Sequence, residues 1–236
     1  MPGMILNFGA AVVVVLIASA CSQANSTPAA AEKSGGAPAP SPTAVAAGTS
    51  DATVAAADKG RIMGEDSART WVIVASDFQC PFCKQWHDDT YRTLLTEYVR
   101  TGKVKVAYIN YPLGQHHNAL VTAEAAMCAG VQKKFWEYHD GLFATQQQWA
   151  QQAAPRPLLD SLAGSVGVDV AQWKRCMDSG AMKPLIKADR DRAASAGVQS
   201  TPSFIIGDQV LLGAQPIDAL RPVLDAVIAK DKSRPR

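Results

Sequence analysis

Short apolar runs and helical patterns alternate along the chain from residue 71 onward. Residues 71–75 form a compact apolar run rich in β-branched side chains, which is typical of a buried strand, and residues 104–109 alternate as a second strand does. Between them, residues 81–100 are polar with an apolar stripe at helical spacing, and residues 101–102 end that helix. A strand, a helix and a second strand in this order predict a parallel β-α-β crossover unit.

The second half of the chain returns to strands only near its end. From residue 117 to about residue 196 only helical patterns occur. Strand character reappears at residues 203–206 and 209–212, and the Gly207-Asp208 pair between them is a strong hairpin signal. Residues 216–230 form a closing amphipathic helix. The order β-α-β, helical block, β-β-α predicts an α/β fold.

The N-terminus has the pattern of an export signal. Residues 8–20 are uncharged and apolar, and this run is too short to span a bilayer comfortably. It ends in small residues at Ala18-Ser19-Ala20-Cys21, which resembles a bacterial lipoprotein cleavage site. We therefore interpret residues 1–20 as a signal peptide and Cys21 as the lipid-bearing residue. The alternative is an ordinary secretory signal with an incidental cysteine at its end.

Residues 21–58 differ in composition from everything that follows. They are dominated by Ala, Ser, Thr, Pro and Gly, and they contain almost no large apolar side chain to offset the entropy of ordering. The pattern predicts a disordered tether. A helix built from the alanine-rich pieces is the alternative, and scattered prolines disfavour it. The folded domain is expected over residues 59–233.

Charge and cysteine content narrow the function. The 236 residues carry a net charge of +2 and no basic run with interleaved aromatic residues, which argues against a nucleic-acid partner. If Cys21 carries lipid, four of the five cysteines remain, and four can pair in three ways. An even number of cysteines in an exported protein suits an oxidising compartment.

The spacing Cys80-x-x-Cys83 falls directly after a predicted strand and opens a predicted helix. A cysteine at a helix N-terminus faces unpaired backbone N–H groups and the positive end of the helix dipole, so we expect a lowered pKa for Cys80. Cys83 lies one turn further on and is expected to close or resolve the disulfide. The alternatives are a purely structural disulfide and half of a zinc site with His87 as a third ligand.

These motifs resemble the DsbA-like thioredoxin-fold family. The resemblance rests on Ser76-Asp77-Phe78-Gln79-Cys80-Pro81-Phe82-Cys83, Tyr111-Pro112-Leu113 with His116, Phe135-Trp136-Glu137-Tyr138-His139, Gly197-Val198 with Thr201-Pro202-Ser203-Phe204, and Gly213-Ala214-Gln215-Pro216. It covers about residues 62–229. The family implies a thioredoxin fold with an all-helical insertion, here at about residues 114–196. It also implies that Thr201-Pro202 is the cis-proline loop where substrate peptides dock beside the Cys-Pro-Phe-Cys motif.

Other positions depart from the family pattern or extend it. The oxidase DsbA carries histidine at the position of Phe82, and such enzymes often keep a buried acid at the position of Val74; Asp77 is close in sequence to that position. Some family members pair cysteines at positions like Cys128 and Cys176. A bridge there would close a loop worth about 3–4 kcal/mol in the chain-entropy model. Two buried thiols are the alternative.

We therefore expect a monomeric thiol-disulfide oxidoreductase that forms or exchanges disulfides in exported proteins and needs no cofactor or metal. Its expected partners are cysteine-containing exported proteins and a membrane redox partner, with a lipid anchor holding it in the periplasm or cell envelope. A disulfide isomerase or reductase of the same fold is one alternative. A non-catalytic envelope lipoprotein that binds metal through Cys80, Cys83 and His87 is the alternative from another class.

Overall fold

The computed structural model describes residues 49–233, which fold around a mixed sheet. Within this range the sheet has five strands in the order β1-β3-β2-β4-β5. The strands are β1 (Ile62–Met63), β2 (Thr70–Ser76), β3 (Val104–Asn110), β4 (Ser203–Ile206) and β5 (Gln209–Leu212). The β2–β3 pair is parallel, with Thr70 opposite Val104, and the other pairs are antiparallel. The strands after residue 70 therefore lie where the hydrophobic pattern predicts them.

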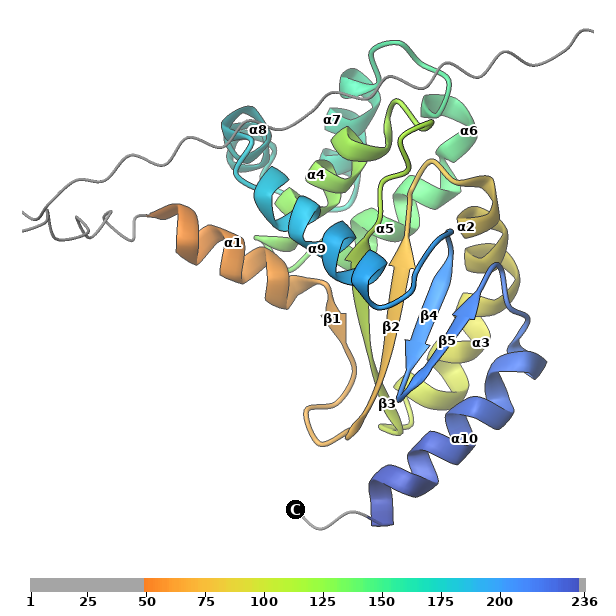
Figure 1. The fold of residues 1–236 in the computed structure, drawn as a ribbon. Helices are drawn as coiled ribbons and strands as arrows, with labels where there is room; N and C mark the ends of the chain where they lie inside the picture. The colour runs from red at the N-terminus through yellow and green to blue at the C-terminus, as the bar shows by residue number, and fades with distance from the viewer. Residues whose placement is uncertain (1–48, 234–236) are drawn as a thin grey trace, which may run out of the picture. The chain divides into compact units, whose positions relative to one another are not determined.

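One face of the sheet is covered by the crossover helix and the last helix. The crossover is continuous through α2 (Pro81–Trp86), η1 (His87–Tyr91), α3 (Arg92–Leu94) and η2 (Leu95–Val99), in which the two η segments are π-helical. The last helix is α10 (Ile217–Ser233). Figure 1 shows α3 and α10 on the same side of the strands. Their apolar side chains and those of the strands form one core, which includes Val72, Val74, Trp86, Tyr91, Leu94, Tyr98, Phe204, Leu220 and Leu224.

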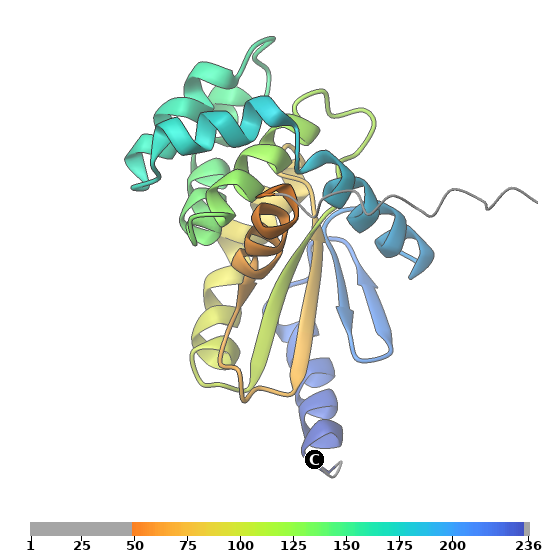
Figure 2. The ribbon, with the colours of Figure 1, turned by 90° about the vertical axis from the view of Figure 1, so that its left-hand side faces the viewer.

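A helical insertion between β3 and β4 lies over the carboxyl ends of β2 and β3 (Figures 1 and 2). It comprises α4 (Ala119–Gly130), α5 (Phe135–Ala144), α6 (Gln146–Trp149), α7 (Arg156–Ser165), α8 (Val170–Ser179) and α9 (Lys183–Ser195). α4 is buried over most of its length because its many alanines let neighbouring helices approach closely. α9 returns to the sheet and packs beside β3. The core of the insertion therefore includes side chains from the end of the sheet, among them Phe78, Cys80 and Tyr108.

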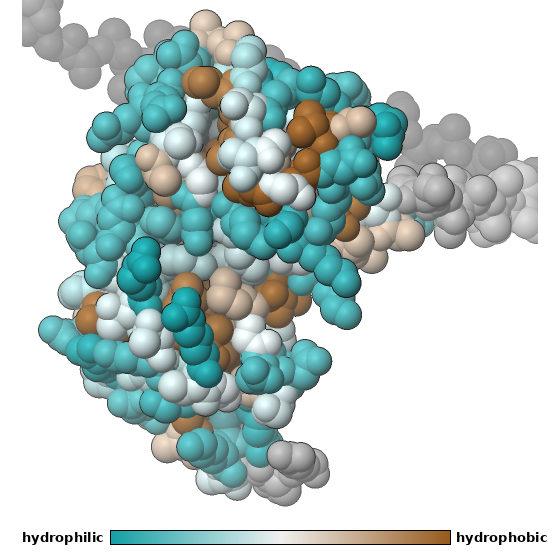
Figure 3. Space-filling view, turned by 180° about the vertical axis from the view of Figure 1, so that it is seen from behind, coloured by the Kyte–Doolittle hydropathy of each residue, from teal (hydrophilic) through white to brown (hydrophobic). Residues whose placement is uncertain are grey.

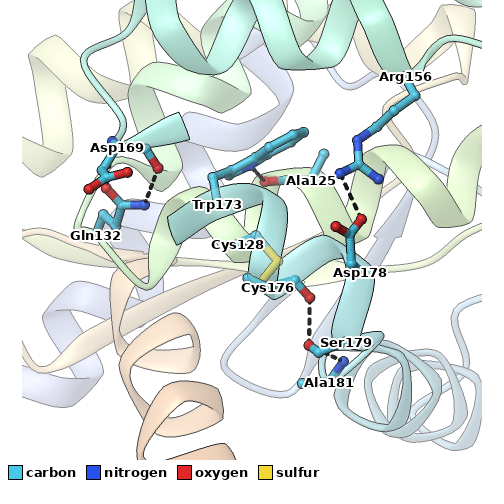
Figure 4. The surroundings of a disulfide bond; sticks show 10 residues. All are labelled: Ala125, Cys128, Gln132, Arg156, Asp169, Trp173, Cys176, Asp178, Ser179 and Ala181. Carbon is cyan, nitrogen blue, oxygen red and sulfur yellow. Dashed lines mark hydrogen bonds and ion pairs between the residues drawn. A yellow bond between two sulfur atoms is a disulfide. The ribbon is translucent and has the colours of Figure 1, made fainter. Parts of the chain in front are cut away.

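A disulfide joins two helices of the insertion. The Cys128 and Cys176 sulfurs are bonded, which links α4 to α8 across a sequence separation of 48 residues. Trp173, one turn before Cys176, is fully buried and donates its indole N–H to the Ala125 carbonyl at 2.9 Å (Figure 4). The disulfide therefore reinforces a helix pair that packing already holds together.

The structure corrects the expected start of the domain. Residues 49–60 form the helix α1 (Thr49–Gly60), not the end of a disordered tether. No proline follows Pro42 in this part of the chain, so the argument against an alanine-rich helix does not reach it. α1 packs against α4, and Ala57 is completely buried there. The expected signal peptide, Cys21 and the rest of the tether lie outside the described residues.

A buried ion network anchors α1 to the domain. The Arg61 guanidinium bonds both carboxylate oxygens of Asp189 in α9 and also pairs with Asp58. Asp189 in turn accepts hydrogen bonds from the Asn110 backbone N–H at 3.2 Å and side-chain amide at 2.9 Å. The strand β1 follows Arg61 directly. With only two residues it is too short to be predicted from a hydrophobic pattern. This network joins α1, α9 and the end of β3.

The surface on the back of the molecule is mostly hydrophilic, and its hydrophobic residues form separate patches (Figure 3). Among residues 49–233, no helix has both the length and the apolar character needed to cross a bilayer.

The contact between α1 and α4 predicts the effect of a small substitution. A Cβ added at Gly60 would lie 2.4 Å from the Gly130 carbonyl oxygen, a backbone atom that cannot rotate away. We expect Gly60→Ala to lower the free energy of unfolding by about 1–3 kcal/mol. The matched control is Gly164→Ala in α7, where the added methyl meets only Val170 at an ordinary 3.6 Å and should raise stability by up to about 1 kcal/mol. Urea unfolding followed by circular dichroism measures both, and a neutral Gly60→Ala would contradict the α1–α4 packing.

Candidate active site

Cys80 occupies the first turn of the crossover helix. β2 ends at Ser76, the chain makes a short turn, and α2 begins at Pro81 with Cys80 as its N-cap in an extended conformation (φ −69°, ψ 124°). Proline fits the first helical position because its missing N–H would have no partner there. The Cys80 sulfur therefore lies at the N-terminus of the helix, where backbone N–H groups favour negative charge.

The Thr201-Pro202 loop faces this sulfur. The Thr201–Pro202 peptide bond is cis, and the Cys80 thiol donates to the Thr201 carbonyl oxygen at 3.5 Å. The sheet brings the two loops together, because Ser203 at the start of β4 pairs with Ala75 near the end of β2. Two segments separated by more than a hundred residues thus form one site.

The two thiols have opposite electrostatic environments. The Cys83 thiol donates to the Cys80 sulfur, which is the main reason that the pKa of Cys80 falls to about 6; burial opposes this shift. Hydrogen bonding to Thr201 and to the backbone N–H groups of Cys83 and Phe82 lowers the Cys80 pKa further. Burial, followed by the hydrogen bond and negative charge of Cys80, raises the pKa of Cys83 well above its usual value. Cys80 is the thiolate of the pair and Cys83 the thiol.

Access to the pair is narrow. The side chains of Cys80 and Cys83 are 3% and 1% exposed, whereas that of Phe82 is 61% exposed. An apolar ring thus projects into solvent beside a nearly covered sulfur.

Asp77 was not among the residues that the sequence marked as part of the site. Its carboxylate is buried and bonds His116 Nδ1 at 2.7 Å and the backbone N–H groups of Leu113 and Gln79 at 2.9 and 2.8 Å. Burial raises the pKa of Asp77, and these hydrogen bonds partly offset that effect. Its own backbone N–H donates to the Cys83 sulfur at 3.5 Å. The position of Asp77 beside the cysteine motif was the only signal that pointed to it.

His116 connects this buried acid to the surface. It lines a pocket of about 720 Å³ together with Leu113 and Leu120 from its own side and Lys183 and Arg190 from α9. The sequence named His116 only as part of the family resemblance, and its contact with Asp77 places it close to the cysteine motif. Val74, where relatives often keep an acid, packs instead in the sheet core.

Glutamine side chains attach the active-site turn to the helical insertion. Gln146 in α6 donates to the carbonyl oxygens of Phe78 and Cys80 at 2.7 and 3.1 Å. Gln79 accepts from the Asn118 backbone N–H at 2.6 Å and donates to the Ala150 carbonyl at 2.7 Å. The sequence marked Gln79 only as part of the cysteine motif and did not mark Gln146, because the partners of both residues lie far away along the chain.

His87 does not join the two cysteines in a metal-ligand set within the described residues. Its ring nitrogens face the carboxylates of Asp88 and Asp140 at 3.1 and 3.2 Å. The residues there whose ligand atoms lie close enough to hold a metal are His87, His139 and Asp140. The structure therefore gives no support to a zinc site formed by Cys80, Cys83 and His87.

Comparison with known proteins agrees with this arrangement. The family model described as Thioredoxin matches residues 56–226. The chain is similar to the probable disulfide bond formation protein D of Bacillus anthracis, with 28% identity over 171 residues that cover 71% of this chain and 78% of that protein. It is also 31% identical over 180 residues to the Na(+)/H(+) antiporter NhaA 1 of Salinispora arenicola, covering 76% of this chain but 26% of that protein.

Two solved structures share the fold. Oxidised BdbD from Bacillus subtilis aligns with a TM-score of 0.65 and 23% identity, covering 72% of this chain and 94% of that chain. Wolbachia pipientis α-DsbA1 aligns with a TM-score of 0.65 and 18% identity, covering 72% and 92%. The prediction of an α/β thioredoxin fold with a helical insertion is confirmed. The chain belongs to the DsbA-like family of thioredoxin-fold thiol:disulfide oxidoreductases.

Proposed function

We propose that this chain introduces disulfides into exported proteins, with Cys80 as the exchanging sulfur and Cys83 as the resolving one. The observation that carries the proposal is the asymmetry of the pair: the Cys80 sulfur, whose pKa is lowered, lies at the start of α2 opposite the Thr201-Pro202 loop, and the Cys83 thiol is buried behind it. This arrangement suits a sulfur that repeatedly forms and releases mixed disulfides.

The exchange proceeds in two steps. A substrate thiolate attacks the Cys80 sulfur of the oxidised protein, the Cys80–Cys83 bond breaks, and Cys83 leaves and takes up a proton. A second substrate thiolate then attacks the substrate sulfur of the mixed disulfide, and Cys80 leaves as a thiolate. The substrate loses two electrons and two protons, and the protein becomes the dithiol. A membrane partner is proposed to reoxidise this dithiol.

The pKa of Cys80 favours the oxidising direction. Because the folded-state pKa of Cys80, about 6, lies below the value of about 8.5 for an ordinary cysteine, ionisation stabilises the folded dithiol. This stabilisation is complete above pH 9, declines as the pH falls toward 6, and is lost below about 6. A reduced form that is stabilised at neutral pH makes the disulfide the better oxidant. An oxidase is therefore favoured over an isomerase or reductase.

The proposal also covers where a substrate binds and where the protein is held in the cell. We propose that an extended peptide docks along Thr201-Pro202 and the exposed ring of Phe82, next to Cys80. Lipid on Cys21 would hold the domain at the cell envelope through the segment that precedes residue 49. The name of the Bacillus anthracis relative, a disulfide bond formation protein, agrees with this assignment.

The catalytic roles predict different defects at the two cysteines. Cys80→Ser should reduce the oxidation of a dithiol peptide, with glutathione disulfide as the terminal oxidant, to the uncatalysed rate. Cys83→Ser should instead accumulate a mixed disulfide at Cys80, because the resolving thiol is missing. Turnover and mass spectrometry measure the two outcomes. The assignment would be refuted if Cys83→Ser lost turnover as fully as Cys80→Ser without a trapped adduct, or if Cys80→Ser kept its turnover. Metal analysis of the reduced protein tests the alternative of a metal-binding protein.

The hydrogen bond from Cys83 predicts a graded effect on Cys80. In the reduced protein, the pH dependence of Cys80 alkylation by iodoacetamide should have a midpoint near 6. Cys83→Ala removes the donor and should move the midpoint toward the value of about 8.5 for an ordinary cysteine. Cys83→Ser keeps a hydroxyl donor and should fall between them. A Cys83→Ala midpoint that stays near 6 would show that the helix N-terminus alone stabilises the thiolate.

A further inference from the structure

Three side chains that can bind a metal ion meet between the helix that begins at the cysteines and α5. His87 in η1 meets His139 and Asp140 of α5, and the ligand atoms of these three residues all lie within 4.8 Å of one another. One carboxylate oxygen of Asp140 is 3.2 Å from His87 Nε2 and 2.8 Å from His139 Nδ1. None of these residues takes part in the disulfide exchange.

The hydrogen-bonding pattern at His87 leaves room for a cation. Both of its ring nitrogens face carboxylates, Nδ1 toward Asp88 at 3.1 Å and Nε2 toward Asp140 at 3.2 Å. A neutral imidazole has one N–H, so it can donate to only one of these two acceptors. When the proton is on Nδ1, the Nε2 lone pair faces a carboxylate oxygen of Asp140, and the two atoms repel each other. A cation bound between them would be coordinated by both atoms. A carboxylate behind the other nitrogen is the usual outer partner of a metal-bound histidine.

The ring of Tyr91 lies beside the cluster, with its centroid 5.2 Å from that of His87 and 5.3 Å from that of His139. Tyr91 is 4% exposed, and its hydroxyl finds no hydrogen-bond partner among residues 49–233. Tyr91, His87 and Asp140 line one pocket of about 380 Å³, with Arg92 and Arg100 also on its wall. A water bound to a metal ion in this pocket could give the hydroxyl its missing partner.

We propose that His87 Nε2, His139 Nδ1 and the Asp140 carboxylate form a binding site for a divalent transition-metal ion of the zinc class. Two nitrogen donors and one oxygen donor suit Zn²⁺, whereas Ca²⁺ and Mg²⁺ prefer oxygen ligands alone. Tetrahedral zinc separates such ligand atoms by about 3.3 Å. The contact between Asp140 and His87 Nε2, at 3.2 Å, has nearly that length, and the contact with His139 Nδ1, at 2.8 Å, would lengthen on binding.

The ion would fasten two parts of the fold. His87 belongs to the helix that starts at Cys80, and His139 and Asp140 belong to the helical insertion. The site would therefore fix the helical insertion against the active-site helix. This proposal does not depend on the direction of disulfide exchange.

Titration of the oxidised full chain with Zn²⁺ tests the site, after any remaining thiol has been blocked by alkylation so that no cysteine can bind the ion. We expect saturable binding of one equivalent, and no comparable binding of Ca²⁺. Asp140→Asn and His87→Gln should each weaken binding at least about tenfold. Asp89→Asn is the matched control, because it removes an exposed carboxylate on the same helix outside the cluster and should leave the affinity unchanged.

Cobalt gives an independent readout of the ligands. Co²⁺ bound to the same protein should show the visible absorption of a nitrogen and oxygen site without a thiolate charge-transfer band. Absence of saturable zinc binding, equal affinity in Asp140→Asn and His87→Gln, or a thiolate band would each overturn the proposal. Circular dichroism establishes that each variant is folded, and His139 is left unchanged because it is buried. Because binding is measured on the oxidised protein without substrate, the result is separate from that of the redox assays.

Discussion

A negatively charged sulfur held almost out of water is the constraint on which this structure depends. Burying a charge is costly unless fixed dipoles replace the solvent. Here the replacement comes from the Cys83 thiol, the Thr201 segment and the first N–H groups of α2. The strand β2 positions all three groups around Cys80. The parallel pairing of β2 with β3 requires a crossover helix after residue 76, and the pairing of β2 with β4 places the cis-proline loop opposite that helix.

The helical insertion makes this arrangement rigid. Gln146 holds the carbonyl oxygens of Phe78 and Cys80, and Gln79 binds the backbone at the start of α4 and after α6. At the same end of the sheet, Arg61 and Asp189 join α1 and α9 to the end of β3, where Asn110 lies opposite Ser76. Each of these buried polar groups would cost free energy if its partner moved, so they define one position for the insertion. The reactive turn is thus fixed from both sides.

The sequence predicted the features whose signals are local. Apolar runs marked the four longer strands, and the position of Cys80-x-x-Cys83 between a strand and a helix marked the redox motif. It failed for α1, which carries no hydrophobic stripe. Of its alanines only Ala57 is buried, where its small side chain fits against α4. Gln146 and the contact between His116 and Asp77 were equally hidden, since each is defined by a partner that only the tertiary fold brings near.

The place of the buried acid shows why position along a strand matters for chemistry. A carboxylate at Val74 would point into the apolar core between the sheet and the crossover helix, away from any route to solvent. Three residues later, beyond the end of β2, the Asp77 carboxylate meets His116, which lines an open pocket. The backbone N–H of Asp77 contacts the Cys83 sulfur. Because burial raises the pKa of Cys83, this sulfur takes up a proton when it leaves the proposed mixed disulfide. An acid placed there lies beside the cysteine pair and in contact with a histidine that lines an open pocket. With the acid at Asp77 instead of Val74, a buried carboxylate lies near the cysteine pair and the core stays apolar.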